Sequence, residues 1–363
     1  MRITGLATEI VQLPADEPLA GAAENPSATR PIVTLTLRTD DGIEGIGVTY
    51  FGGPLTAALR AAVEGLGALA IGEDPLRIEA IGRKLYDAAN YSGPAGIFTL
   101  AFSAIDMALW DIKGKALGAP LWRLLGGARE RVPTYASGAL MRGLTLERAT
   151  ASARRLVETG FREVKMQLAL PGETSPELEV ARARAIRDAV GAETRLMVDI
   201  NQRWRPEQAI DIGRRLEGLG LAWLEDVTVA DDYRGLARVT RALATPIAGG
   251  EYVWGITPLR HMLEAHSVDI VMIDLVRVGG ITGWLKVAGM AEAFNLPVVS
   301  HLIPEVHVHL IGAIPNGLTV EYMPWLMRLF EAVPRPEQGE LKMPQAPGLG
   351  LAFDKDAIRR FRA

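Results

Sequence analysis

The stretch RLMVDINQRWRPEQAIDIGRRLEGLGLAWLEDV, residues 195–227, contains one complete strand–helix–strand pattern. Its two ends, RLMVDI and AWLEDV, are short apolar runs of the kind that form buried parallel strands. The segment between them has the apolar spacing of an amphipathic helix and finishes at Gly220, a common helix terminator. We therefore predict a βαβ unit in which Asp199 and Glu225 each end a strand.

The same alternation continues from about residue 132 to residue 323. Eight apolar or β-branched runs alternate with longer amphipathic segments, and this count predicts an α/β fold, a (β/α)₈ barrel. An open doubly wound sheet is the competing architecture, but the chain has neither a GxGxxG after its first strand nor a Walker A sequence. The runs are VPTYASGAL (132–140), REVKMQLAL (162–170), RLMVDI (195–200), AWLEDV (222–227), PIAGGE (246–251), VDIVMIDLV (268–276), PVVSHL (297–302) and LTVEYM (318–323).

The two ends of the chain lack this rhythm. RPIVTLTLRTDDGIEGIGVTY, residues 30–50, reads as a β-hairpin with a DDG turn, and helical stretches follow it. We predict an α+β domain over residues 1–125, the barrel over 126–323, and a segment rich in Pro and Gly over 324–363 that packs back on the first domain.

Composition excludes several classes of function. The chain has 363 residues and a formal net charge of −4, which argues against general nucleic-acid binding. It contains no Cys, so disulfides, thiolate zinc sites and cysteine nucleophiles are excluded. The N-terminus shows no signal-peptide pattern and no apolar run reaches about 18 residues. We expect a cytoplasmic protein without a membrane partner.

Three carboxylates are predicted to meet at one end of the barrel. Asp199, Glu225 and Glu251 end three consecutive predicted strands, and active sites of such barrels lie at these strand ends. Unpaired carboxylates in one low-dielectric mouth repel each other unless a cation holds them, and oxygen ligands without thiolate or imidazole favour Mg²⁺. Pairing of each carboxylate with a nearby Lys or Arg is the alternative.

The next strand ends carry an acid and a histidine. Asp274 ends VDIVMID and His301 follows PVVS, so their side chains are predicted to meet across adjacent strands. A carboxylate bonded to one imidazole nitrogen fixes the tautomer and leaves the other nitrogen as a base near neutral pH. Glu321, after LTV, is expected to complete the ring as a hydrogen-bond donor. Lys165 and Gln167 alternate on the second strand, so both are expected to point into the barrel.

The other histidines are predicted to be structural. His307 and His309 lie in EVHVHLIGA, which reads as helical, and positions two apart do not share a helix face. His261 and His266 belong to another predicted helix, TPLRHMLEAH. Of the five histidines, His301 is therefore the one we assign to the site.

Taken together, these motifs resemble the enolase superfamily, and within it the mandelate racemase subgroup. The resemblance covers nearly the whole chain, and several motifs in a fixed order make it specific. They are TDDGIEGIG (39–47), SAIDMALWDIKGKALGAPLWRLLGG (103–127), MVDINQRW (197–204), WLEDV (223–227), GGEYVWG (249–255), IDLVRVGGITGW (273–284), SHLIPEVHVHL (300–310) and VEYMPW (320–325).

The resemblance implies an enolase-like barrel with an N-terminal capping domain whose mobile loops close over a small carboxylate substrate. It implies Mg²⁺ on the three carboxylates and the His301–Asp274 pair as general base. By similarity, Lys165 would bind the substrate carboxylate, Asn201 a substrate hydroxyl, and Glu321 the opposite carboxylate oxygen. The resemblance also leads us to expect a homo-oligomer.

Substrate specificity is expected to come from the capping side, from residues 14–30 and from Tyr50–Pro54. Tyr50 is therefore a candidate substrate contact. Arg277, in DLVRVGG, either supports Asp274 or contacts substrate, and a structural ion pair is the reading that we favour.

One departure from the family pattern concerns the second strand. The family commonly has Lys-X-Lys there, the second lysine being a base, whereas this chain has Lys165-Met166-Gln167. An amide cannot abstract a proton, so Gln167 argues against a racemase with two bases. We therefore predict a dehydratase acting on a sugar acid or other hydroxy acid, in which His301 takes the α-proton to give an enediolate and then protonates the leaving hydroxyl. Enzymes of this superfamily combine a Lys or His base with Mg²⁺ on the enediolate, and the predicted scheme follows that pattern.

Three alternatives stay open. An epimerase or cycloisomerase would use Lys165 together with His301. A binding or scaffold protein without catalysis is disfavoured by the intact acids and the intact dyad. A zinc hydrolase is disfavoured because no histidine lies at an early strand end.

Overall fold

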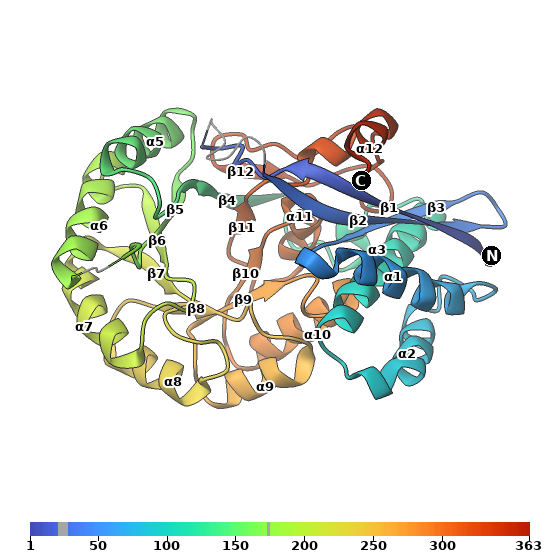
Figure 1. The fold of residues 1–363 in the computed structure, drawn as a ribbon, viewed down its shortest axis with the longest axis horizontal. Helices are drawn as coiled ribbons and strands as arrows, with labels where there is room; N and C mark the ends of the chain where they lie inside the picture. Colours follow the sequence, from blue (N-terminus) through green and yellow to red (C-terminus); the bar gives the residue numbers. More distant parts are fainter. Residues whose placement is uncertain (21–27, 173–174) are drawn as a thin grey trace.

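The computed structural model describes residues 1–20, 28–172 and 175–363. A ring of helices surrounds a parallel sheet on one side of the molecule, and a smaller sheet with its own helices lies on the other (Figure 1). The eight parallel strands of the larger part confirm the predicted barrel. They are β4 (Arg131–Leu140), β5 (Glu163–Gln167), β6 (Arg195–Asp199), β7 (Leu221–Glu225), β8 (Ile247–Gly249), β9 (Ile270–Asp274), β10 (Val298–His301) and β11 (Val320–Tyr322).

The barrel closes between its last strand and its first. β11 pairs with β4 in parallel, and the remaining edge to β10 is joined by a bridge between Val298 and Gly317 and by the Glu321 amide, which donates to Ser300 Oγ at 2.8 Å. The helices outside the strands are α5 (Leu146–Glu158), α6 (Pro176–Val190), α7 (Pro206–Leu216), α8 (Tyr233–Ala242), α9 (Ile256–Glu264), α10 (Gly280–Ala293) and α11 (Pro304–Ala313). None of the described helices is both long and apolar enough to span a membrane.

The barrel interior is packed below the strand ends. A cluster separate from the main core joins side chains from several strands, and Trp223 meets Tyr135 edge to face with ring centroids 5.5 Å apart. Such a filled interior confines polar chemistry to the mouth of the barrel. The cluster contains Tyr135, Met197, Trp223, Ala248, Ile270, Met272 and Val299.

The N-terminal part is a three-stranded antiparallel sheet covered by helices. The predicted hairpin is present, with Arg38 opposite Glu44 across the turn. A first strand that the sequence pattern did not predict pairs along the whole outer edge of this hairpin. The elements are β1 (Ile3–Pro14), β2 (Thr29–Thr39), β3 (Glu44–Thr49), α1 (Thr56–Ala70), α2 (Ile78–Ala89), α3 (Ile97–Ala116) and the short α4 (Leu121–Leu124).

Close contact between β3 and α3 depends on glycine. A Cβ added at Gly47 would lie 2.0 Å from the carbonyl oxygen of Ala104. We expect Gly47→Ala to lower the free energy of unfolding by about 3 kcal/mol, because backbone atoms on both sides would have to move. Urea titration followed by circular dichroism measures this change.

Gly65→Ala is the matched control for this substitution. Gly65 lies exposed in α1 with nothing within 4 Å of its added Cβ, so the change should be neutral or stabilise by up to about 1 kcal/mol. Equal destabilisation by both substitutions would contradict the packing argument.

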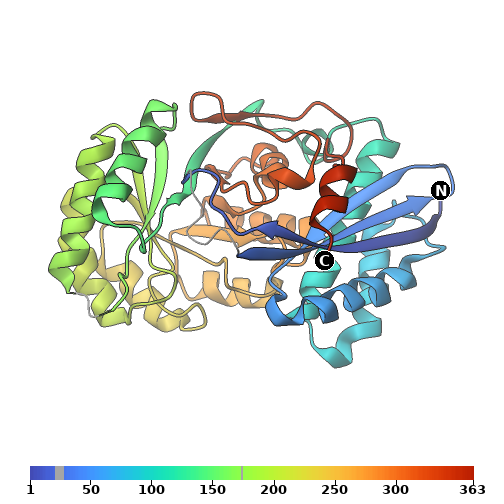
Figure 2. The same ribbon diagram turned by 45° about the horizontal axis from the view of Figure 1, so that its top comes forward.

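The C-terminal segment contacts both parts of the molecule (Figure 2). β12 (Glu340–Lys342) pairs antiparallel with β4 of the barrel, and α12 (Lys355–Phe361) lies against β1. The Ala363 amide donates to the Ile10 carbonyl, and the buried Asp111 of α3 accepts from the Leu349 amide at 2.9 Å. The domain boundaries at residues 125 and 323 stay a prediction. The C-terminal segment contacts the N-terminal part, and it also adds a strand beside β4 of the barrel.

Candidate active site

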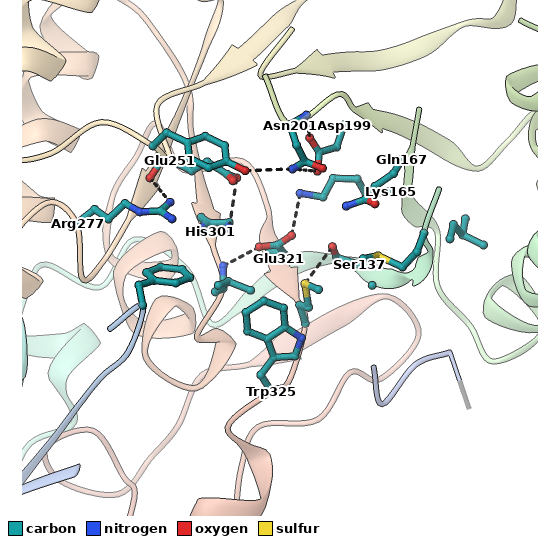
Figure 3. Close-up of a pocket in the computed structure, with 17 residues that line it drawn as sticks. Ser137, Lys165, Gln167, Asp199, Asn201, Glu251, Arg277, His301, Glu321 and Trp325 are labelled. Carbon is teal, nitrogen blue, oxygen red and sulfur yellow. Dashed lines mark hydrogen bonds and ion pairs between the residues drawn. The ribbon is translucent and has the colours of Figure 1, made fainter. Parts of the chain in front are cut away.

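With the exception of Tyr50, the predicted site residues lie at or beside the carboxyl ends of the barrel strands, around a cavity of about 180 Å³ (Figure 3). Strand register explains their grouping, because Gln167 is opposite Asp199, Asp199 opposite Glu225, and His301 opposite Asp274. The side chains that line the cavity are those of Phe51, Ser137, Leu140, Met141, Lys165, Gln167, Asp199, Asn201, Glu251, Tyr252, Arg277, His301, Leu302, Glu321, Met323 and Trp325, with the backbone of Gly138.

The acidic cluster differs in one member from the predicted set. Asp199, Glu225 and Asp226 offer oxygen atoms that all lie within 4.8 Å of one another, whereas Glu251 is 3.3 Å from His301 Nε2. The structure therefore adds Asp226 to the acids that the sequence analysis placed together, and it puts Glu251 between this trio and the histidine. The neighbouring acid in WLEDV was the available signal for Asp226.

These four acids are suited to a divalent cation. All four are buried, and Asp226 Oδ2 has no hydrogen-bond partner among the described residues. Burial and the charges of neighbouring carboxylates raise the pKa of Glu225 to about 7 and hold the pKa values of Asp226 and Glu251 well above the usual range. A bound Mg²⁺ would offset the electrostatic repulsion between these buried carboxylates, and carboxylate oxygens are ligands that Mg²⁺ prefers.

The histidine and its acid form a dyad. His301 Nδ1 lies 2.6 Å from Asp274 Oδ2, and Asp274 Oδ1 accepts from the amides of Val276 and Arg277. Burial opposes the imidazolium, but Glu251 and Asp274 outweigh it and raise the pKa of His301 to about 9. Asp274 holds Nδ1, so Nε2 is the atom directed toward Glu251. A pKa of about 9 means that the ring is protonated at neutral pH while Glu251 carries a full negative charge, and a divalent cation on Glu251 would lower this pKa and free Nε2 to act as a base.

Lys165 is held by two carboxylates. Its Nζ lies 2.5 Å from Glu225 and 2.8 Å from Glu321, and the side chain is buried. Glu321 also accepts from the Leu302 amide, and although burial acts in the opposite direction, Lys165 and His301 lower the pKa of Glu321 to about 2. Glu321 is thus an acceptor toward the Leu302 amide and Lys165, and its expected donor role toward a substrate carboxylate stays a prediction.

Two amides line the cavity beside the acids. Asn201 Nδ2 donates to Asp199 at 2.7 Å and to Tyr252 Oη at 3.3 Å, while its Oδ1 accepts from the Arg142 guanidinium. Gln167 Oε1 faces the Arg142 amide at 3.5 Å. This orientation leaves the Gln167 amino group to donate, as expected for an amide that binds a ligand rather than removing a proton.

Phe51, and not the predicted Tyr50, lines the cavity. Tyr50 is buried and is not among the residues that line the cavity, and its hydroxyl finds no partner within the described chain. The next residue, Phe51, lines the cavity instead, because its positive φ of 70° turns the chain at the end of β3. Side chains alternate along a strand, and the pattern contained no signal for this turn.

Arg277 forms no ion pair with any carboxylate of the described residues, so the structural ion pair that we favoured is wrong. Its guanidinium donates to the Glu251 carbonyl at 2.7 Å and lies 4.2 Å from the Phe51 ring and 4.9 Å from the Tyr252 ring. Arg277 therefore connects a loop of the N-terminal part to the loop that carries Glu251.

The segment over residues 14–30 reaches the cavity through Trp325. Trp325 Nε1 donates to Glu17 at 2.8 Å, and the Arg30 guanidinium lies 3.6 Å from the centre of the Trp325 ring. Residues 21–27 of this segment lie outside the described residues. Pro14, Thr29 and Arg30 belong to strands, so the connecting loop is shorter than predicted.

The remaining histidines agree with a structural role, with one change of position. His307 and His309 are buried in α11, and their ring nitrogens contact the Leu302 and Leu349 carbonyls. Burial lowers the pKa of each to about 4, so both are neutral. His261 lies in α9, whereas His266 follows the helix instead of belonging to it.

Comparisons with known proteins show the family to which the chain belongs. Residues 7–126 match the family described as mandelate racemase/muconate lactonizing enzyme, N-terminal domain, and residues 148–357 match the one described as enolase C-terminal domain-like. The chain is 31% identical to 3,6-anhydro-alpha-L-galactonate cycloisomerase of Streptomyces coelicolor, over 99% of both chains. It is 32% identical to L-talarate/galactarate dehydratase of Salmonella typhimurium, over 99% of this chain and 90% of that one.

A solved structure gives the same relationship in three dimensions. The L-talarate dehydratase from Polaromonas sp. JS666, complexed with Mg and L-glucarate, superposes with a TM-score of 0.91 at 31% identity, over 99% of this chain and 97% of that one. Both halves of the sequence, the order of the strands and the placement of acids and histidine at the barrel mouth therefore lead to one conclusion. This chain belongs to the mandelate racemase/muconate lactonizing enzyme family of the enolase superfamily.

Proposed function

We propose that this protein is a Mg²⁺-dependent lyase that dehydrates a sugar acid or related hydroxy acid to a 2-keto acid. The observation that carries the proposal is the pairing of one complete base, His301 with Asp274 at 2.6 Å, with an amide, Gln167, where a second base would be needed. The dehydratases among the relatives support it.

In the proposed reaction His301 Nε2 removes the proton on the carbon next to the substrate carboxylate. The resulting imidazolium returns that proton to the hydroxyl on the β-carbon, which leaves as water together with the C–O bonding electrons. The enol that remains becomes the 2-keto acid by tautomerisation. One residue can serve as base and then as acid, so no second base is required.

The other residues would orient the substrate carboxylate and stabilise the negative charge that develops on it. Lys165 supplies a positive charge that we assign to this carboxylate, with Glu321 on the far side and Asn201 toward a hydroxyl. Magnesium, held by Asp199, Glu225 and Glu251 with Asp226 beside them, would stabilise the negative charge that accumulates on the carboxylate oxygens.

An epimerase or cycloisomerase is the second candidate, favoured by the similarity to a cycloisomerase and by Lys165 at the cavity. Incubation of acid sugars with Mg²⁺ in D₂O distinguishes the two. We expect a 2-keto acid to form in step with loss of the α-proton, detected by semicarbazide derivatisation and NMR. Exchange of the α-proton without keto product would reject the dehydratase.

We further propose that the enzyme works in the cytoplasm as a homo-oligomer. The family membership supports this proposal. We propose a small-molecule substrate as the binding partner, and neither nucleic acid nor a membrane. Cell fractionation and light scattering coupled to size-exclusion chromatography test the two parts separately.

A further inference from the structure

The side-chain amide of Asn201 is bound by neighbouring side chains at both of its ends. Its Oδ1 accepts from the Arg142 guanidinium, and its Nδ2 donates to Asp199 Oδ2 at 2.7 Å and to Tyr252 Oη at 3.3 Å. A guanidinium only donates and an ionised carboxylate only accepts, so these two partners fix which end of the amide is oxygen and which is nitrogen. Both N–H groups are thereby used, and the Asn201 side chain has no hydrogen left to donate to a ligand.

The Tyr252 hydroxyl still has a hydrogen to donate. Because the Asn201 amide donates to it, Tyr252 Oη is the acceptor in that bond, and its own hydrogen is available to another partner. Among the residues that the structure describes, none accepts this hydrogen, and the side chain lines the cavity. Tyr252 therefore supplies, beside Asn201, the donor that Asn201 itself lacks.

The side chain of Tyr252 is held at its ring as well as at its hydroxyl. The Arg277 guanidinium lies 4.9 Å from the centre of the Tyr252 ring and donates to the backbone carbonyl of Glu251, the preceding residue, at 2.7 Å. Asn201 fixes the oxygen end of the same side chain. A donor held in this way loses little freedom when a ligand binds, so more of its hydrogen-bond energy appears as affinity.

The proposed reaction limits which substrate hydroxyl Tyr252 reaches. His301, on β10, has to reach both the α-proton and the leaving β-hydroxyl, so the β-hydroxyl faces His301. Tyr252 Oη is bonded instead to Asn201, which follows β6 and holds Asp199. Of the hydroxyls that remain, the one on the α-carbon lies nearest the substrate carboxylate and hence nearest the acidic cluster to which Asp199 belongs.

We propose that Tyr252 is a specificity-determining residue whose hydroxyl donates a hydrogen bond to the α-hydroxyl oxygen of the substrate. Asn201 is then a positioning residue that acts on this hydroxyl through Tyr252. The inference rests on the proposed function and deepens it, because it names the side chain that recognises a 2-hydroxy acid. One such hydrogen bond favours the 2-hydroxy acid over the matching deoxy acid by about 3- to 10-fold in affinity.

Two small acids that differ only in this hydroxyl test the proposal. Lactate has the α-hydroxyl and propanoate lacks it, and neither has a β-hydroxyl to lose, so both are binding probes that cannot be dehydrated. Their affinities for the Mg²⁺-loaded protein are measured by NMR titration, with each enantiomer of lactate. We expect the wild type to bind one enantiomer at least about threefold more tightly than propanoate.

Tyr252→Phe removes only the hydroxyl and should lower this ratio of affinities about 3- to 10-fold, while the affinity for propanoate stays within about twofold. Asn201→Ala should lower the ratio to the same extent, and the double variant should lower it no further, as expected for two side chains that act through one contact. Any change in Mg²⁺ affinity would affect both probes alike and cancel in the ratio. Tyr86→Phe makes the same change at an exposed tyrosine of α2 and should leave the ratio unchanged.

Three results would overturn the inference. A wild type that prefers neither enantiomer of lactate over propanoate contradicts it directly. A ratio that is unchanged in Tyr252→Phe but lost in Asn201→Ala would assign the hydroxyl contact to Asn201 itself. An equal loss of affinity for both probes in Tyr252→Phe would leave Tyr252 with a structural role only.

The same probes separate this inference from the proposed function, because their binding does not depend on dehydration. If no acid sugar yields a 2-keto acid but the ratio falls in Tyr252→Phe, the dehydratase proposal fails and the contact from Tyr252 stands. Release of a 2-keto acid by the wild type, together with an unchanged ratio in Tyr252→Phe, keeps the dehydratase and rejects the contact.

Discussion

Replacing His301 with asparagine is expected to reduce kcat for dehydration by about 10²- to 10⁴-fold, the contribution of a positioned base. Asparagine keeps a polar side chain at the end of β10 but has no nitrogen that accepts and returns a proton. The acidic cluster is untouched, so Mg²⁺ affinity measured by calorimetry should change far less than kcat. The assay follows 2-keto acid release under substrate saturation.

Two controls define what this loss means. His261→Asn changes an exposed histidine of α9 in the same way and should retain wild-type activity. In D₂O, His301→Asn should also lose exchange of the substrate α-proton. Exchange that persists at the wild-type rate would show that Lys165 removes the proton, and the runner-up isomerase would then replace the dehydratase.

Removal of divalent metal is expected to reduce the dehydratase activity by as much as His301→Asn does, or by more. Charge stabilisation by a bound metal is worth several kcal/mol, so chelation with EDTA should lower activity by at least about 10³-fold, and added Mg²⁺ should restore it. Asp199→Asn and Glu225→Gln should not be rescued at millimolar Mg²⁺. The readout independent of activity is the rise in Tm on adding Mg²⁺, which the wild type should show and these variants should lack.

Asp211→Asn is the control for the metal variants, because Asp211 is an exposed acid of α7 that pairs with Arg215. It should respond to Mg²⁺ as the wild type does. A Mg²⁺-dependent rise in Tm of wild-type size in both Asp199→Asn and Glu225→Gln would place the metal elsewhere.

The acidic cluster also sets a direction for pH dependence. The pKa of Glu225 is raised to about 7, so below this value part of the population carries a proton that must leave before a metal binds. Mg²⁺ affinity should therefore increase as pH rises from about 6 to 8, with proton release on binding. Calorimetry in buffers of different ionisation enthalpy measures the released protons, and binding without release would contradict the assigned ligands.

Much of the architecture follows from the order of residues alone. The last residue of each apolar run was predicted to lie at the mouth of the barrel, because all parallel strands of a barrel have their carboxyl ends there. For this reason Asp199, Glu225, Asp274 and His301 could be grouped before any coordinates were known. The hairpin at residues 30–50 followed in the same way from alternation and a DDG turn.

What the sequence could not decide lies in the residues just beyond each strand. Asn201, Asp226 and Leu302 have φ values of 49°, 44° and 55°, in the left-handed region that residues other than glycine seldom adopt. These turns bring Asp226 into the acidic trio. Phe51 makes a similar turn, and it faces the cavity in place of Tyr50.

The sequence by itself thus determined the barrel, the acids and histidine at its mouth, and the amide where a second base would stand. Only the tertiary structure decided which charges meet: Lys165 with Glu225 and Glu321, and Glu251 with His301. The physical reason is that strand periodicity fixes the direction of a side chain within an element. The partner of a charge at the mouth depends instead on loop dihedrals and rotamers, which are set by packing between segments far apart in the chain.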